Sequence, residues 1–233
     1  DFAAKYNVTD SVSRTKHFVD TTRSNVVILV ESWGIPMDSI LFRKELNVFD
    51  GNVHAQGIHF RMYSRTRTAE REDLLKFMSK DTVGRKDSLF LPQAFAEMGY
   101  RTSFLFGGDS LEQWRYKYLR NMGFRHLHFG GDESDKGVVA VIDSMLNAAT
   151  QDSSRYFLAW TTRDTRFPMV GNADQVDSTY RSRLMETLEL IAELGRKHPE
   201  VRFVVQGDHE PILSPIAFQR RFYKRWVPYV VLN

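Results

Sequence analysis

A run of five aliphatic residues at positions 26–30, directly followed by Glu31, constrains the fold of this chain more than any other feature. Short runs that are entirely apolar and rich in β-branched side chains are typical of central parallel strands, which helices cover on both faces. In open α/β sheets, ligands bind beyond the carboxyl ends of the strands. Glu31 is therefore a candidate site residue. The alternative interpretation is a carboxylate that only caps the following loop.

The composition fits one large globular domain. The chain has 233 residues, of which 42% are hydrophobic and 26% charged, which allows a substantial core. The formal net charge of +3 does not indicate a nucleic-acid partner, because nucleic-acid-binding proteins usually carry a clustered basic face. Basic residues cluster at 61–71 and 220–225, where a solvated face is the first interpretation and contact with anionic lipid or phosphate the second.

The chain has no cysteine, and this excludes several kinds of chemistry. Disulfides, thiolate metal ligands and cysteine nucleophiles are ruled out, as is the cysteine that many sulfatases convert to formylglycine. No run of eighteen apolar residues and no signal-peptide core is present. We therefore expect a soluble domain whose targeting or membrane segment lies outside these residues.

Alternating helix and strand patterns predict an α/β fold with a mostly parallel central sheet and helices on both faces. Residues 1–24 are expected to form a lead-in helix or extended arm, and residues 25–233 one catalytic domain. Residues 35–63 show little periodicity and are expected to be irregular, with at most one short helix. Strands are predicted at 26–30, 100–106, 124–129, 155–161, 201–205 and 229–232. Helices are predicted at 66–78, 89–98, 111–121, 138–149 and 175–196.

Two candidate metal ligands follow a second predicted strand. Asp208 and His209 follow the predicted strand at 201–205, and Gly207 before them allows a sharp turn of the backbone. The carboxyl ends of parallel strands meet at one edge of the sheet, so Glu31 is expected close to this pair. Two carboxylates and one imidazole suit Zn²⁺ or Mn²⁺. The alternative interpretation of Gly-Asp-His by itself is a structural turn.

A hydroxyl at the start of the predicted helix at 66–78 would supply a nucleophile. The first turn of a helix favours anions, and a nearby metal lowers the pKa of a hydroxyl. Thr68 is the candidate for this position, and Thr66 is its competitor. A plain N-cap is the alternative role for either side chain.

Three segments in order, N-V-V-I-L-V-E-S-W-G, R-T-A-E-R-E and V-V-Q-G-D-H-E-P, resemble the alkaline-phosphatase-like sulfatase superfamily. The resemblance is strongest to its lipoteichoic acid synthase branch of phosphoglycerol and phosphoethanolamine transferases, and it implies an alkaline-phosphatase/sulfatase-like fold. In that family a strand-terminal Glu, a Thr in a T-x-x-x-E helix start and an Asp-His pair bind one divalent metal, and the Thr is the nucleophile. The resemblance maps these roles onto Glu31, Thr68, Asp208 and His209. Thr68 is preferred because Glu72 stands four residues after it.

The resemblance also covers the substrate side and spans residues 25–233. Trp114 and Arg115 resemble the family's substrate-side helix, and W-V-P-Y-V-V-L-N resembles its final strand. The loop T-T-R-D-T-R-F-P places Arg163 or Arg166 where the family often has a phosphate-holding His, and Phe106 replaces another family His. Arginine can hold a phosphate but cannot act as a general acid or base near neutrality. Solvated surface is the alternative for the arginines, and His126 and His128 match no motif.

The implied function is transfer of a phospholipid head group, phosphoglycerol or phosphoethanolamine, through a phospho-threonine to a glycan or polymer acceptor. The implied cofactor is one divalent metal, Mn or Zn. The expected location is the extracytoplasmic face of a bacterial membrane, with membrane contact through segments absent from this chain. Two alternatives remain: a phosphodiesterase or sulfatase that uses water, and a binding domain that has lost turnover.

Overall fold

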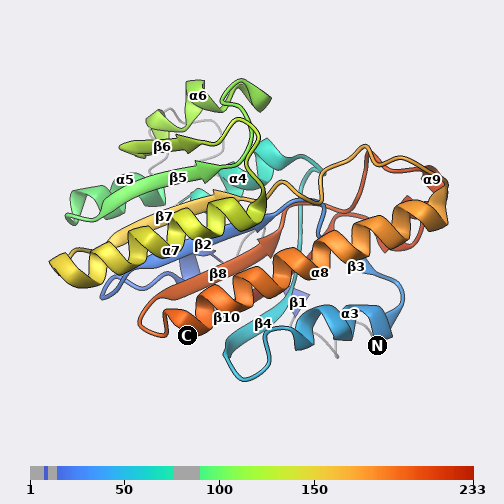
Figure 1. The fold of residues 1–233 in the computed structure, drawn as a ribbon, viewed down its shortest axis with the longest axis horizontal. Helices are drawn as coiled ribbons and strands as arrows, with labels where there is room; N and C mark the ends of the chain where they lie inside the picture. The colour runs from blue at the N-terminus through green and yellow to red at the C-terminus, as the bar shows by residue number, and fades with distance from the viewer. Residues whose placement is uncertain (1–7, 10–14, 76–89) are drawn as a thin grey trace.

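The computed structural model describes residues 8–9, 15–75 and 90–233, and these form an α/β fold around one large sheet (Figure 1). Its eight strands have the order β1-β4-β10-β8-β2-β7-β5-β6, and β10 alone among them runs against the others. The predicted mostly parallel sheet is therefore confirmed. The bounds are β1 Val8–Thr9, β2 Asn25–Val30, β4 Val53–Phe60, β5 Arg101–Phe106, β6 His126–Phe129, β7 Tyr156–Thr161, β8 Arg202–Gly207 and β10 Trp226–Leu232.

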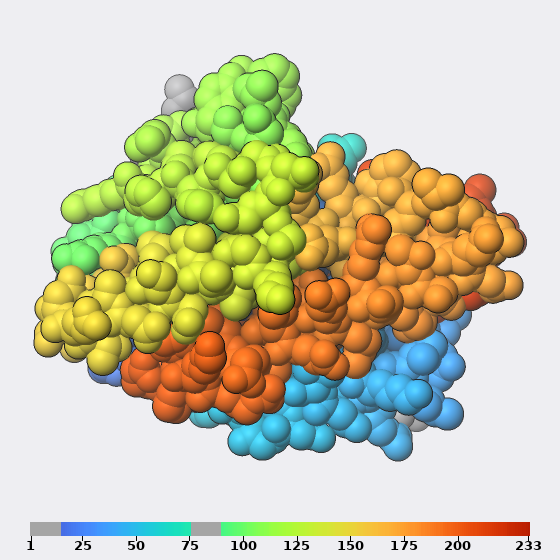
Figure 2. Space-filling view, viewed as in Figure 1, coloured from blue at the N-terminus to red at the C-terminus, as the bar shows by residue number. Residues whose placement is uncertain are grey.

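Helices cover both faces of the sheet, as the sequence predicts. On one face α7 (Asp135–Asp152) and α8 (Ala173–Lys197) lie over the central strands, and their side chains close this face in the space-filling view (Figure 2). Their apolar residues form one core with β2, β7 and β8. On the other face α5 (Leu91–Glu97) packs Phe95 against Phe157 of β7. The remaining helical segments are α2 Thr15–Phe18, α3 Ser39–Asn47, α4 Thr66–Leu74, η1 Glu112–Trp114, α6 Arg115–Tyr118, η2 Arg120–Met122 and α9 Ile216–Gln219.

Strand β2 lies in the interior of the sheet, between β8 and β7, and every one of its residues is buried. Its unbroken apolar run suits this position, because helices cover both faces of the sheet there. It pairs in parallel with β7 on one side and with β8 on the other. In this register Val30 at the end of β2 lies opposite Gly207 at the end of β8. The two chain segments that follow, at Glu31 and Asp208, therefore leave the sheet side by side.

The expectation of an irregular segment at 35–63 is wrong. This segment contains β3 (Ile35–Pro36), which pairs with β9 (Phe222–Tyr223), then α3 and the eight-residue strand β4. Strand β4 mixes exposed and half-buried positions in its first half and includes His54, Gln56 and Gly57, so its apolar pattern is weak. Antiparallel pairing with β10 along its whole length compensates for this weak pattern.

Smaller differences concern the ends and one helix. Residues 8–9 add a strand to the sheet and residues 15–18 form a helical turn, so the lead-in segment belongs partly to the fold. The predicted helix at 111–121 is broken, since Gln113 and Trp114 both adopt left-handed backbone angles. The predicted helix limits at Met78 and Leu89 lie outside the described residues. Within the described ranges, no helix combines the length and the apolar character needed to cross a bilayer.

Candidate active site

The structure brings Glu31, Asp208 and His209 together at the carboxyl edge of the sheet. One ligand atom from each side chain lies within 4.8 Å of the others, and in the described part of the chain this is the single such group of three. His209 Nε2 is 3.1 Å from Asp208 Oδ2 and 3.7 Å from Glu31 Oε1. The expected convergence of the two strand ends therefore exists in the fold.

Position 207 requires glycine because the backbone of Trp33 packs directly against it, and not because its backbone angles exclude other residues. A Cβ atom on Gly207 would lie 1.9 Å from the carbonyl oxygen of Trp33. The segment after β2 and the segment after β8 can therefore pack together only if residue 207 lacks a side chain. The sequence indicated a need for glycine at position 207 to allow a sharp turn, whereas in the structure the need comes from contact with the Trp33 backbone.

Backbone hydrogen bonds aim the ligand atoms into the site. Asp208 Oδ1 accepts from the backbone N–H groups of Ser32 and His209, both at 2.7 Å, which leaves Oδ2 directed at the site. His209 Nδ1 lies 2.7 Å from the carbonyl oxygen of Glu210, so Nδ1 is the protonated donor there. The lone pair of His209 Nε2 consequently faces the carboxylates, which is the tautomer that a metal ligand needs.

Thr66, and not Thr68, is the hydroxyl that the fold delivers to this group. Thr66 Oγ1 lies 2.8 Å from Asp208 Oδ2 and 3.2 Å from His209 Nε2, and 3.4 Å from Glu31 Oε2. Thr66 is the first residue of α4, whereas Thr68 lies two residues further, about 200° around the helix, and faces elsewhere. The choice of Thr68 is therefore corrected to Thr66.

The sequence spacing admits Thr66 as well as Thr68. Glu70 stands four residues after Thr66, so Thr66 meets the same T-x-x-x-E spacing that favoured Thr68 with Glu72. The overlapping repeat R-T-R-T made the two registers equivalent at the level of sequence. Only the path of α4 into the site separates them.

Two buried arginines hold α4 in place. Arg61 donates to both Asp73 carboxylate oxygens, at 2.6 and 2.9 Å, and to the carbonyl oxygen of Gly207 at 2.7 Å. It thereby ties the end of α4 to the end of β8, next to Asp208. Nothing in the sequence motifs pointed to Arg61, whose partners lie 12 and 146 residues away.

Arg115 is the second of these arginines, and its placement corrects the expectation that it contacts substrate. Its side chain is 2% exposed, donates twice to Glu70 Oε1 at 2.8 and 2.9 Å, and stacks on the Phe106 ring. Glu70 also accepts from Thr161 Oγ1 and from the Tyr118 hydroxyl. Arg115 therefore holds α4 rather than a ligand.

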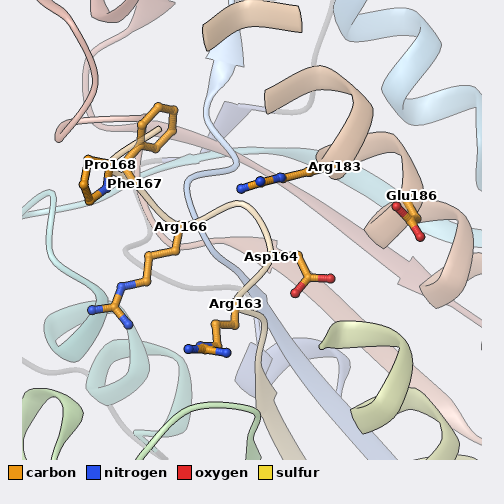
Figure 3. Close-up of a pocket in the computed structure, with 7 residues that line it drawn as sticks. All are labelled: Arg163, Asp164, Arg166, Phe167, Pro168, Arg183 and Glu186. Atoms are coloured by element: carbon orange, nitrogen blue, oxygen red, sulfur yellow. The ribbon is translucent and has the colours of Figure 1, made fainter. Parts of the chain in front are cut away.

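Two of the three remaining predicted substrate residues, Arg163 and Arg166, line two adjoining cavities. A cavity of about 470 Å³ contains Glu31, Thr66 and His209 and is also lined by Arg65, Arg67, Gln113 and Arg166. A neighbouring cavity of about 610 Å³ is lined by Arg163, Asp164, Arg166 and Arg183, among others (Figure 3). Arg166 lines both, Arg163 lines only the second and pairs with Asp132, and Trp114 lies outside them, 54% exposed. The unmatched His128 pairs with Glu133 away from the site.

The electrostatics of the site favour a cation. Burial, together with the negative charge of Asp208, raises the pKa of Glu31 to about 7. Burial lowers the pKa of His209, but the carboxylates of Asp208 and Glu31 outweigh this effect and raise it overall. Two carboxylates and an imidazole lone pair held this close are a ligand set for one divalent ion such as Zn²⁺ or Mn²⁺.

Comparisons with known proteins give matches in structure only. No family model matches the sequence, and no curated protein does. A protein of the alkaline phosphatase superfamily from Vibrio parahaemolyticus has a TM-score of 0.68 at 15% identity, over 91% of this chain and 60% of that chain. The chain therefore spans well under two thirds of that protein's length.

Two transferase-related structures match as well. The Streptococcus pyogenes phosphoglycerol transferase GacH, in complex with sn-glycerol-1-phosphate, has a TM-score of 0.68 at 14% identity, over 93% of this chain and 70% of that chain. The C-terminal periplasmic domain of Escherichia coli EptC, in complex with Zn, has a TM-score of 0.68 at 12% identity, over 91% and 72% of the two chains. The strand order, the central β2 and these three matches together show that the chain has the fold of the alkaline phosphatase superfamily, as the sequence resemblance implies.

Proposed function

We propose that this chain is the catalytic domain of a metal-dependent phosphotransferase that moves a phospholipid head group, phosphoglycerol or phosphoethanolamine, to a hydroxyl on a glycan or polymer. The observation that carries the proposal is the position of Thr66 Oγ1, 2.8 Å from Asp208 Oδ2 and 3.2 Å from His209 Nε2, at the start of α4. The fold shared with GacH, solved with sn-glycerol-1-phosphate, supports this substrate class.

Glu31, Asp208 and His209 would hold one divalent ion, and the Zn complex of EptC makes zinc the first candidate, with manganese second. Such an ion supplies positive charge that lowers the pKa of a hydroxyl and stabilises charge on the phosphate. The lone pair of His209 Nε2 and the raised pKa of Glu31 are both consistent with this role.

In the first step Thr66 Oγ1 attacks the phosphorus of the lipid phosphodiester. The hydroxyl proton is released to solvent, the bond from phosphorus to the diacylglycerol oxygen breaks, and that oxygen leaves with a proton from solvent. In the second step the acceptor hydroxyl attacks the phosphorus of phospho-Thr66 and releases its proton to solvent, the bond from phosphorus to Thr66 Oγ1 breaks, and Oγ1 takes a proton from solvent. Arg65, Arg67 and Arg166 line the cavity and would neutralise the phosphate.

Arg163 reaches the neighbouring cavity, where it would act on the acceptor side. The donor is a membrane lipid, and the matched EptC domain is periplasmic, so we place this domain at the extracytoplasmic face of a bacterial membrane.

Intact mass measurement tests the proposal. The chain, loaded with zinc or manganese, is incubated with vesicles that contain phosphatidylglycerol or phosphatidylethanolamine. We expect an added mass equal to one phosphoglycerol or phosphoethanolamine group, which disappears in Thr66→Ala. Thr68→Ala is the matched control and should keep the adduct, because its hydroxyl lies outside the ligand group.

Each other outcome identifies a competing function. Release of glycerol phosphate or phosphoethanolamine into solution, without any acceptor, would favour the hydrolase. Metal-loaded protein that never carries an adduct and releases no product would favour a binding domain. An adduct lost in Thr68→Ala but kept in Thr66→Ala would overturn the assignment of the nucleophile.

A further inference from the structure

Exposed apolar side chains gather around the mouth of the cavity that contains Thr66. Large apolar side chains in the described residues are mostly buried, so those left in solvent stand out. Several of them lie on, or within three residues of, segments that line this cavity. We define the rim by six of these side chains: Met62, Tyr63, Trp114, Val170, Leu213 and Ile216.

The rim comes from four separate loops rather than from one helix face. Met62 and Tyr63 precede Ser64, which lines the cavity, and Val170 follows Pro168, which lines it as well. Leu213 itself lines the cavity, and Ile216 begins α9 three residues later. Val170 is 98% exposed and Ile216 68%. Each of the loops that carry the rim residues therefore contributes to the lining of the same cavity.

The loop that carries Trp114 has two consecutive non-glycine residues with left-handed backbone angles. Gln113 and Trp114 have φ of 55° and 57°, in the left-handed region that non-glycine residues rarely adopt. Gln113 lines the cavity, whereas Trp114 projects outside and is 54% exposed. With these backbone angles, two neighbouring side chains have different surroundings, Gln113 in the cavity and Trp114 in solvent.

Basic side chains lie among the apolar ones. Arg65, Arg67 and Arg166 line the same cavity mouth and are exposed. Lys117 lies 4.5 Å from the Trp114 ring centre. Aromatic and aliphatic side chains interleaved with cations match the interface of an anionic bilayer, where apolar groups enter the head-group region and cations meet lipid phosphates.

We infer that this rim docks the domain directly on an anionic phospholipid bilayer, so that a lipid head group enters the Thr66 cavity without leaving the membrane surface. The inference rests on the proposed function for the identity of the bound head group. The docking itself requires neither metal nor turnover. It adds a membrane contact made by this chain to any made by segments outside it.

Vesicle co-sedimentation tests the docking separately from catalysis. The metal-free chain is mixed with vesicles of phosphatidylcholine containing 30% phosphatidylglycerol, and the lipid concentration that binds half of the protein is measured. The double variant Val170→Ser, Ile216→Ser should require about tenfold more lipid, because two exposed aliphatic groups no longer enter the bilayer. Met98→Ser is the matched control, since Met98 is 49% exposed but ends α5, far from α9 (Figure 1).

Further measurements distinguish membrane docking from the proposed phosphotransfer and from binding of the rim to a second copy of this chain. Thr66→Ala should bind vesicles like the parent, whether or not the phospho-threonine step occurs. Pure phosphatidylcholine, or 0.5 M salt, should weaken the binding several-fold because the cationic contribution is screened. Equal binding by the double variant and Met98→Ser, or no vesicle binding by the parent, would overturn the inference. A concentration-dependent dimer that the double variant abolishes would assign the rim to a second copy instead.

Discussion

Glu31 follows β2, and one of its carboxylate oxygens lies within 4.8 Å of one of Asp208, with His209 Nε2 close to both. Ser32 donates to Glu31 Oε1 at 3.1 Å, and Arg115, the one arginine that influences its pKa, is already bound to Glu70. Two carboxylates in this position are costly to bury unless a cation joins them. Glu31 is therefore the residue whose replacement tests the candidate metal site most directly.

Replacement of Glu31 should abolish the metal site and leave the fold intact. Glu31→Gln keeps the shape of the side chain but removes a charged ligand, so we expect affinity for zinc to fall by more than about 100-fold. Titration calorimetry and metal content after dialysis measure this. Glu210→Gln is the matched control, because the Glu210 carboxylate accepts from Ser64 and Arg225 and is not part of the ligand group. Full retention of zinc by Glu31→Gln would refute the site.

At the scale of elements, α4 is placed by its partners and not by its own propensity. It has nine residues, no side-chain N-cap hydrogen bond and four buried acidic or polar groups, so it would be unstable alone. Arg61 fixes Asp73 and Glu72, while Arg115 fixes Glu70. These three ion pairs set where the first residue of α4, Thr66, lies relative to Asp208.

Removal of Arg115 tests whether it positions α4. Arg115→Met leaves Glu70 buried with only Thr161 and Tyr118 as donors, and we expect a loss of about 3 to 5 kcal/mol in the free energy of unfolding. The kcat for head-group transfer should fall, with little change in KM. Arg163→Met, which breaks an exposed pair with Asp132, should cost less than about 1 kcal/mol. A pure rise in KM at unchanged stability would instead make Arg115 a substrate ligand.

At the scale of the whole molecule, several acids are buried with raised pKa values. Burial, ahead of all other causes, raises the pKa of Glu31 to about 7, Glu45 to about 8, Glu72 to about 7 and Asp135 to about 6. In the unfolded chain these groups titrate near 4. Between these values the folded state binds more protons than the unfolded state at these four groups. Their contribution to stability is therefore complete below the unfolded pKa and is lost as pH rises through the folded values.

The metal-free chain should therefore be less stable at pH 8 than at pH 5.5, by at least about 2 kcal/mol. Urea unfolding in the presence of a chelator at both pH values measures this difference. Glu45→Gln should make the pH dependence smaller without touching the site, whereas Glu189→Gln, at an exposed position of α8, should not change it. Metal should restore stability mainly at the higher pH, where Glu31 is ionised. Equal stability at both pH values would contradict the expectation.

The sequence by itself determined the elements whose apolar pattern is strong. β2, β7, β8 and the long helices α7 and α8 lie where their patterns place them, because each buries its own stripe or run in one core. The order of the motifs predicted that Glu31, Asp208 and His209 would meet, since parallel strands end at one edge. Local patterns could not reveal β4, whose stability comes from pairing with a strand more than 160 residues later.

Only the tertiary structure decided between Thr66 and Thr68 and gave Arg115 its role. Both threonines stand in the same sequence spacing, and the choice depends on the rotation of α4. Arg61 sets this rotation by joining Asp73 to the distant Gly207, and Arg115 sets it by binding Glu70 from 45 residues away. The same holds for the apolar rim, whose members belong to loops without a common pattern. Periodic burial can be predicted from the local sequence, because it follows from the spacing of apolar residues. The orientation of a short helix and the proximity of separate loops cannot, because both depend on contacts between residues far apart in the chain.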